Sequence, residues 1–179
     1  TTNTDMTLGD SGTGITLAGN TTLNTGSGDL SINGVLAGAD NNDSLTLNSE
    51  GTTTIGAAIT GITTLATDSE GTTVINANVS SSGNQTYNDN VTFNGTRELT
   101  STSGTVNFAS TIAGTDGATD DLTITGILDL DGALTNINDL AVSSTSNLAA
   151  NVTTSGTQTY TSAVVTDGSR TLQGTTVNF

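Results

Sequence analysis

Apolar and polar residues alternate in short stretches along the whole chain. In Ile15-Thr-Leu17, Leu30-Ser-Ile32 and Val91-Thr-Phe93, one polar residue stands between two apolar ones. This period of two is typical of a β-strand with one buried face. Clusters of Gly, Asn, Asp and Ser, such as residues 25–28, separate these stretches and favour turns. The pattern therefore predicts many short strands joined by tight turns.

No window of the sequence predicts a helix of three turns. The β-branched residues Thr, Val and Ile dominate the strand-like stretches, and Gly recurs every few residues. Apolar residues also do not recur at the i, i+3, i+4, i+7 spacing of an amphipathic helix. The sequence therefore predicts an all-β fold.

Longer segments of the chain repeat one another. Residues 78–87 recur as residues 151–160, with seven identities in ten positions at an offset of 73. Residues 15–40 match residues 91–116 at an offset of 76, with apolar character kept at each apolar position. Such self-similarity is the signature of a repeat protein. We expect one continuous domain over residues 1–179, with long units at 5–79, 80–152 and, in part, 153–179.

Short strands, tight turns and few large apolar residues favour a right-handed parallel β-helix, or β-solenoid. Coils of roughly 19 to 25 residues would give about seven to nine short coils, with three or four coils in each long unit. Residues at equivalent points of two units, such as Asn107 and Asn178, are expected to form ladders along the stack. Because the last motif stops partway through a pattern complete elsewhere, we expect the chain to be a segment of a longer repeat protein.

Two other structures are compatible with parts of this pattern. Tandem β-sandwich domains also have short alternating strands, but such small domains usually need a bulky aromatic core. Here three Phe and two Tyr serve the whole chain. Disorder would suit a chain in which Thr, Gly, Asn and Ser fill more than half of the positions, but it gives no reason for matched apolar positions in two copies.

The composition and charge of the chain exclude several kinds of functional site and partner. The chain has no His, Cys or Lys, which excludes disulfides, imidazole or thiolate metal sites and Ser-His-Asp triads. The formal net charge is −15, and Arg97 and Arg170 are the only basic residues. Such a chain repels phosphate backbones and anionic lipids, and no apolar run approaches the roughly 18 residues that cross a bilayer. We therefore expect no nucleic-acid partner and no membrane insertion.

The texture of the repeats carries a resemblance to a known family. Residues 83–93, 99–108 and 121–126 resemble the repeats of very large bacterial surface proteins of the filamentous-haemagglutinin-like adhesin class. The resemblance covers nearly all of the chain and rests on repeat texture, which autotransporter passengers and other large β-strand-repeat proteins share. The absence of Cys agrees with this class.

The resemblance implies a structural, non-catalytic role. It implies export to the extracellular space or the bacterial outer surface, and a rigid rod or fibre that acts in adhesion or cell-cell contact. The implied partners are neighbouring repeats of the same protein, with end-to-end or lateral self-association, and a glycan or protein receptor on a host or cell surface.

Two acidic loops are the best candidates for chemistry. Residues 38–44 and 114–121 occupy the same place in successive units, and each gathers carboxylate side chains. Ca²⁺ takes oxygen ligands of this kind, although neither loop matches an EF-hand or the calcium-binding nonapeptide repeat. The candidate Ca²⁺ ligands are Asp40, Asp43, Asp116, Asp120 and Asp121. Otherwise no cofactor is predicted, and plain solvated turns explain the same residues.

Two further pairs of charged residues have structural explanations. Asp129 and Asp131 share one outward face if their stretch is a strand, which favours a solvent-facing edge over a metal site. Arg97 and Arg170 are expected to pair with nearby acids, for which the candidates are Glu98 and Asp167.

Two aromatic residues, Tyr87 and Tyr160, occupy equivalent positions in two units. They are expected to cap or flank the core, whereas exposed tyrosines would be able to stack on sugar rings.

Two other functions remain as alternatives to a structural rod. A carbohydrate-acting β-helical enzyme would use a pair of carboxylates, but nothing singles out one pair among the repeated turns. A glycan-binding module belongs to the same alternative. An ice-binding solenoid would need a Thr-X-Thr pair on the same strand of every coil, and the pairs in this chain are irregular.

Overall fold

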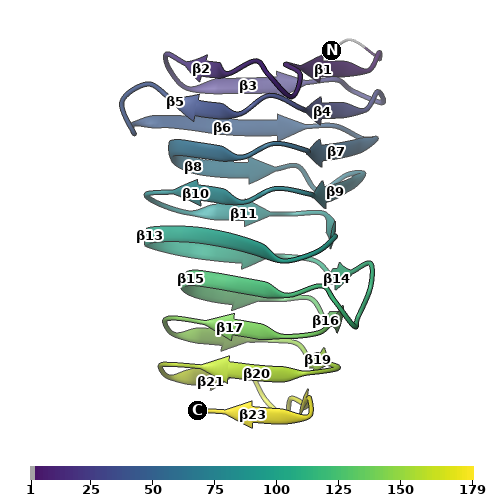
Figure 1. The fold of residues 1–179 in the computed structure, drawn as a ribbon, viewed down its shortest axis with the longest axis vertical. Helices are drawn as coiled ribbons and strands as arrows, with labels where there is room; N and C mark the ends of the chain where they lie inside the picture. The colour runs from purple at the N-terminus through teal and green to yellow at the C-terminus, as the bar shows by residue number, and fades with distance from the viewer. Residues whose placement is uncertain (1–2) are drawn as a thin grey trace.

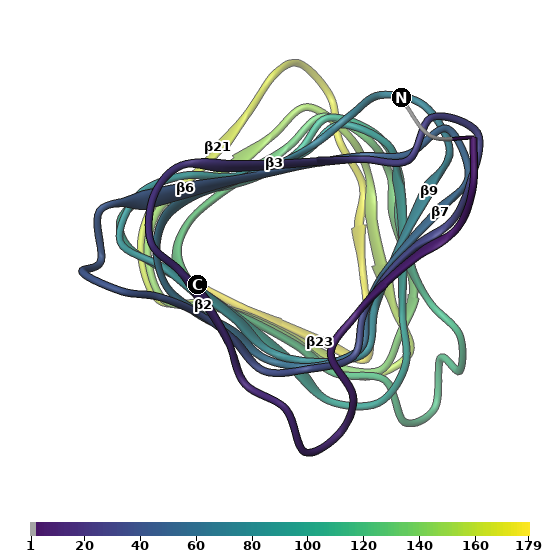
Figure 2. The ribbon, with the colours of Figure 1, turned by 90° about the horizontal axis from the view of Figure 1, so that it is seen from above.

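A computed structural model describes residues 3–179, in which the chain forms 23 β-strands and no helix. The strands wind into a three-sided prism with the two ends of the chain at its opposite ends (Figure 1). Seen from the N-terminal end, the chain turns clockwise as it recedes from the viewer, so the coils are right-handed (Figure 2). Neighbouring strands run parallel on all three faces. The predicted right-handed parallel β-helix is confirmed.

The first side of the prism, here called face 1, is a nine-stranded sheet to which each coil contributes one strand. Its strands are β1 (Met6–Leu8), β4 (Leu30–Ile32), β7 (Thr52–Ile55), β9 (Thr72–Ile75), β12 (Asn90–Phe93), β14 (Ile112–Gly114), β16 (Leu134–Ile137), β19 (Val152–Thr154) and β22 (Leu172–Gln173).

The other two sides form one bent sheet, because three long strands continue around the corner between them. Face 2 consists of β2 (Ile15–Leu17), β5 (Leu36–Gly38), β8 (Ile59–Thr67), β10 (Val79–Ser81), β13 (Arg97–Phe108), β15 (Leu122–Leu130), β17 (Leu140–Val142), β20 (Thr157–Tyr160) and β23 (Thr176–Asn178). Face 3 consists of the second halves of β8, β13 and β15 together with β3 (Thr21–Asn24), β6 (Asp43–Asn48), β11 (Gln85–Tyr87), β18 (Ser146–Leu148) and β21 (Val164–Thr166).

The winding comprises nine coils, the last of which is represented by β22 and β23. The length of a coil varies because the turns vary. Thr73 pairs with Val91, 18 residues further on, whereas Leu99 pairs with Ile124, 25 residues further on. The strands keep their register through these changes, as expected when insertions are confined to surface turns.

The core is a thin column of side chains along the axis of the prism. Inward residues alternate with outward ones on each strand, and the buried ones form a single apolar cluster that extends from Leu17 to Tyr160. Most of its members are Leu, Ile and Val. Three faces close around a narrow interior, so one or two inward side chains per strand fill it and few aromatic residues are needed.

The long sequence units do not stack directly on one another. The repeated segment that contains β10 on face 2 recurs as the segment that contains β19 on face 1. From β10 to β19 the chain passes eleven faces, one fewer than four complete coils would need, and the same is true from β2 to β12. Each unit is therefore rotated by one face of the prism relative to the unit before it.

This rotation corrects the expectation that equivalent residues form ladders. Asn107 lies on face 3 and pairs with Thr86 and Asp129. Asn178 lies on face 2 and pairs with Thr159. The predicted ladder relationship between the two asparagines is wrong, because the unit contains a fractional number of coils.

Candidate functional site

The first acidic loop connects β5 to β6 at the corner between faces 2 and 3. Asp43, the first residue of β6, is buried, and its Oδ2 accepts a hydrogen bond from the Ala39 backbone N–H at 3.1 Å. Asp40 Oδ1 accepts a hydrogen bond from the Asn42 N–H at 3.0 Å. Asn41 has a φ of 58°, a left-handed conformation that Asn tolerates better than most residues. The two aspartates thus close the loop.

The second acidic loop, between β14 and β15, is built around Asp120. This side chain is only 1% exposed, and it accepts hydrogen bonds from the backbone N–H groups of Gly95 (2.5 Å) and Asp116 (2.6 Å) and from Thr115 Oγ1 (3.1 Å). Burial raises the pKa of the Asp120 carboxyl, but these hydrogen bonds to the charged form outweigh burial and leave the pKa below its ordinary value.

The remaining acids of this loop also have protein partners. Asp116 Oδ1 accepts a hydrogen bond from the Ala118 N–H at 3.0 Å. Asp121 Oδ1 accepts from Asn138 Nδ2 at 2.9 Å and from the Asp139 N–H at 3.2 Å. Its second oxygen, Oδ2, accepts from Thr96 Oγ1 at 3.3 Å.

The two loops are equivalent in sequence but lie at different corners of the prism, as the rotation of the units requires (Figure 2). Within residues 3–179 no group of three or more acidic side chains is arranged to hold a metal ion. The carboxylates predicted as Ca²⁺ ligands instead accept hydrogen bonds from their own loops and from neighbouring coils. The alternative reading of both loops as plain solvated turns is wrong for Asp43 and Asp120, which are buried, and Ca²⁺ binding stays a prediction.

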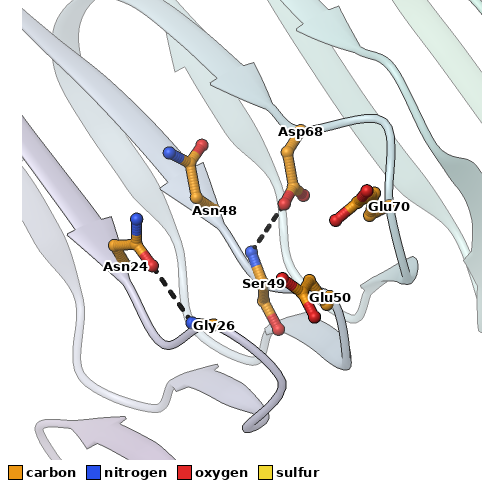
Figure 3. Close-up of a pocket in the computed structure, with 7 residues that line it drawn as sticks. All are labelled: Asn24, Gly26, Asn48, Ser49, Glu50, Asp68 and Glu70. Atoms are coloured by element: carbon orange, nitrogen blue, oxygen red, sulfur yellow. Dashed lines mark hydrogen bonds between the residues drawn. The ribbon is translucent and has the colours of Figure 1, made fainter. Parts of the chain in front are cut away.

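A different acidic site, unmarked in the sequence, lies at the corner between faces 3 and 1 (Figure 3). It is a shallow groove of about 230 Å³. Asn24 and Asn48 are paired in register at the ends of β3 and β6, and Asp68 follows the end of β8 in the next coil. The complete lining consists of Asn24, Gly26, Asn48, Ser49, Glu50, Asp68 and Glu70.

The groove is negatively charged, and hydrogen-bond donors reach only part of its carboxylate oxygens. Asp68 Oδ2 accepts a hydrogen bond from the Ser49 N–H at 2.9 Å, whereas Asp68 Oδ1 is buried without a partner. Burial raises the pKa of Asp68, and the negative charges of Asp89 and Glu70 raise it further. No basic side chain lines the groove. Asp68 therefore holds a proton more readily than an aspartate in water does.

Asp89 lies close to this groove, in the interior of the prism. It is 3% exposed and accepts hydrogen bonds from Thr73 Oγ1 at 2.8 Å and from Thr67 Oγ1 at 3.0 Å. Burial raises the pKa of Asp89, and the two hydroxyl donors oppose the shift without cancelling it. Sequence reasoning missed Asp68 and Asp89, because their proximity depends on the register of successive coils and not on any spacing within one segment.

The predicted pair Asp129 and Asp131 lies on face 3 and in the turn that follows it. Asp129 points outward on face 3, where burial and the nearby Asp131 raise its pKa, and Asn107 Nδ2 donates to Asp131 Oδ2 at 3.4 Å. Asp129 pairs with Asn107 on one side and with Asn147 on the other, so it lies within the sheet of face 3, and the predicted solvent-facing strand edge is wrong.

The two arginines do not form the predicted ion pairs. Arg97 Nη1 donates to the Thr96 carbonyl at 2.8 Å, and Arg170 Nη1 donates to the Ser169 carbonyl at 3.2 Å. The Nε atoms of both side chains are buried without a partner. Glu98 instead accepts hydrogen bonds from two threonines, so its predicted pairing with Arg97 is wrong.

The two tyrosines are core residues. Tyr87 and Tyr160 are 0% and 1% exposed, and their rings stack on Phe108 and Phe179 at centroid distances of 5.2 and 5.8 Å. Each hydroxyl donates to the Oε1 of a buried glutamine two residues earlier, at 3.1 Å in both cases. Both rings lie inside the core and do not cap or flank it as predicted, and their burial excludes their use as exposed platforms for sugar rings.

Outward threonines do not form regular pairs on successive coils. On face 1, β7 presents Thr52 and Thr54, but the positions paired with them are Thr72 and Val74 on β9. The next strand, β12, continues these columns with Asn90 and Thr92.

Comparisons of this chain with protein-family models, with curated proteins and with solved structures found no match. Within the part of the chain that the structure describes, no helix has the length and apolar character needed to span a membrane.

Proposed function

We propose that this chain is a structural, non-catalytic segment of a secreted or cell-surface protein, in which it acts as a rigid rod in adhesion or cell-cell contact. One observation carries the proposal. A single apolar core continues through the coils along the axis, and each interior strand is hydrogen-bonded to the strands before and after it in the stack.

This construction suits a spacer because backbone hydrogen bonds on all three faces hold each coil to the next along the axis. Backbone hydrogen bonds of the three faces point along the axis, so a force that pulls the ends apart acts on many bonds in parallel. At a strand spacing of about 4.8 Å, nine coils span roughly 40 Å. Duplication of a unit adds length while the cross-section stays the same, since every added coil rests on the one before it.

The distribution of charge supports a soluble rod. The net charge is −15, and most acids lie at the corners and turns rather than at the centres of the faces. Placement at the cell surface is supported by the resemblance of residues 83–93 and 99–108 to adhesin repeats.

Small-angle X-ray scattering and a glycan-array screen together test the proposal. A rod predicts an elongated distance distribution for the purified chain, and a tandem fusion of two copies should show about twice the maximum dimension of one copy with an unchanged cross-sectional radius. A compact tandem fusion would contradict the rod. Saturable binding of one glycan, or its turnover, would favour the carbohydrate-acting alternative.

A further inference from the structure

A shallow hollow lies near the middle of face 2, on strands from three successive coils. Its volume is about 180 Å³, and residues of β8, β10 and β13 line it. The outward side chains there are small: Ala58 precedes β8, and Thr60 and Ser80 lie on β8 and β10. A second hollow of about 130 Å³ adjoins the first, since Ser80 lines both. Because β5 pairs with β8 and β15 with β13, further coils lie on both sides of the hollow.

Glu98 lines this hollow and is held in place by its neighbours. Its Oε1 accepts hydrogen bonds from Thr100 Oγ1 at 3.3 Å and from Thr125 Oγ1 of the next coil at 3.1 Å. Its backbone N–H donates to Asn78 Oδ1 at 3.0 Å. No donor within residues 3–179 bonds to the second carboxylate oxygen, Oε2. One oxygen of Glu98 is thus fixed, and the other is open to a molecule from outside.

The negative charge of Glu98 has no basic partner within the described chain. Arg97 is next to it in sequence, but successive residues of a strand point to opposite sides of the sheet. The Arg97 guanidinium donates instead to the Thr96 carbonyl at 2.8 Å. Arg170 lies before β22, far along the axis, and the sequence contains no Lys. A lysine that neutralises Glu98 must therefore come from outside this sequence.

We propose that the hollow binds a lysine side chain of a basic protein partner. An ammonium group has three N–H donors and no acceptor. Glu98 Oε2 accepts one of these donors, and the hydroxyl oxygens of Thr60 and Ser80 in the same hollow are acceptors for the others. A guanidinium prefers two parallel bonds to both oxygens of a carboxylate, and two hydroxyl groups already occupy Oε1. This inference rests on the proposed function in adhesion, and it names the chemistry of the partner.

A basic protein suits the hollow better than a glycan does. No aromatic side chain lines the hollow, and both tyrosines of the chain are buried, so a sugar ring finds no stacking platform there. The net charge of −15 attracts a basic partner from a distance and speeds their encounter. Glycan binding at this hollow is therefore an outcome that would overturn the proposal.

NMR titration of the 179-residue chain with a tetralysine peptide, at about 0.15 M salt, tests the proposal. We expect saturable shifts of the Ser80 and Glu98 amide signals, and acetylation of the four lysines should abolish them. Glu98→Gln keeps an oxygen for the two threonine hydroxyls and removes only the charge, so it should weaken binding about fivefold. Glu70→Gln makes the same change in the acidic groove between faces 3 and 1. It is the matched control and should have little effect.

A second pair of variants tests the shape of the hollow. Ala58→Met fills the hollow without a change of charge and should also weaken binding. Ala141→Met, at an outward position of face 2 outside the hollow, should leave binding unchanged. Thermal unfolding checks that each variant is folded.

Three results would overturn the proposal. Equal losses for Glu98→Gln and Glu70→Gln would show attraction to the overall charge rather than a site. Tighter binding of tetra-arginine, or saturable shifts of the same signals with an uncharged glycan, would contradict a lysine site. An elongated scattering profile would still support the rod in each case, so the two proposals fail separately.

Discussion

Gln85 and Gln158 make the same set of hydrogen bonds although they lie on different faces of the prism. Gln85 Nε2 donates to the Val79 carbonyl, Ser81 Oγ and the Thr100 carbonyl at 3.3, 3.2 and 2.7 Å. Gln158 Nε2 donates to Val152 O, Thr154 Oγ1 and Gln173 O at 3.3, 3.4 and 2.8 Å. The long sequence unit therefore conserves a local three-dimensional arrangement while its position around the axis shifts by one face.

Substitution of either buried glutamine should destabilise the rod. Gln85→Leu removes a donor that joins two coils and leaves the Tyr87 hydroxyl without its acceptor inside the core. We expect a loss of about 2 to 4 kcal/mol in the free energy of unfolding, measured by urea denaturation. Gln173→Leu, at an exposed position on β22, is the control and should change it by less than about 0.5 kcal/mol.

The buried Asp89 predicts a protein that is more stable in mild acid than at neutral pH. Its pKa is raised in the folded state, so the folded protein binds a proton at a pH where the unfolded chain does not. Stability should therefore rise as the pH falls from 7 through the folded pKa toward about 4, the ordinary value for Asp. Asp68, whose pKa is also raised, acts in the same direction.

Below about pH 4 the trend should reverse. The pKa of Asp120 is lowered in the folded state, so its contribution to stability is present above the unfolded value and is lost as the pH falls further. Thermal unfolding between pH 3 and 8 should show a maximum. Asp89→Asn should reduce the rise from neutral to mild acid, whereas Asp167→Asn, an equal change of charge at an exposed site, should leave it intact. A midpoint that falls steadily from pH 7 downward would contradict this account.

The parallel fold was predictable because its signals are local. Alternation in stretches such as Val91-Thr-Phe93 identifies a strand with one inward face, and the turn residues between the stretches limit its length. The number of faces per unit was not predictable in this way. The strands β8, β13 and β15 pass around a corner near a single glycine, which is Gly61, Gly104 or Gly126. A lone glycine inside a strand-like stretch is a weaker turn signal than the Gly, Asn, Asp and Ser clusters between other strands, so a count of those clusters underestimates the number of faces.

The candidate sites show the same limit. The acidic loops are contiguous in sequence and were found, but the role of Asp120 depends on Gly95, which lies 25 residues away in the preceding coil. Asp68 and Asp89 come from different coils, and only the register of β6, β8 and β11 brings them to one corner. To predict these contacts from the sequence, one would need to know the length of each coil, and this length varies from coil to coil.

Calcium removal should leave the stability of the chain unchanged. The carboxylates of Asp43 and Asp120 accept hydrogen bonds from the protein itself, so a cation is not needed to hold either loop closed. We expect equal unfolding midpoints in EDTA and in millimolar Ca²⁺. A midpoint that rises with Ca²⁺ and falls with EDTA would instead support a metal site.

The Asp120 loop should depend on its carboxylate rather than on a bound ion. Asp120→Ala removes the acceptor of three hydrogen bonds and should cost about 2 to 3 kcal/mol, with or without Ca²⁺. Asp40→Ala, at an exposed position in the other loop, should cost much less. Equal effects of the two substitutions in urea denaturation would show that burial of Asp120 is unimportant.

A glycine at the corner between faces 3 and 1 allows successive coils to approach each other closely. Gly71 has a φ of +73°, and a Cβ at this position would overlap the Gly51 carbonyl oxygen of the preceding coil. Gly71→Ala should therefore cost about 2 to 4 kcal/mol in urea denaturation, through backbone strain and separation of the two coils. Gly168→Ala is the matched control, because Gly168 has a similar φ of +76° and nothing lies within 4 Å of the added Cβ. If both substitutions changed stability equally, close backbone contact at this corner would not be what holds the coils in register.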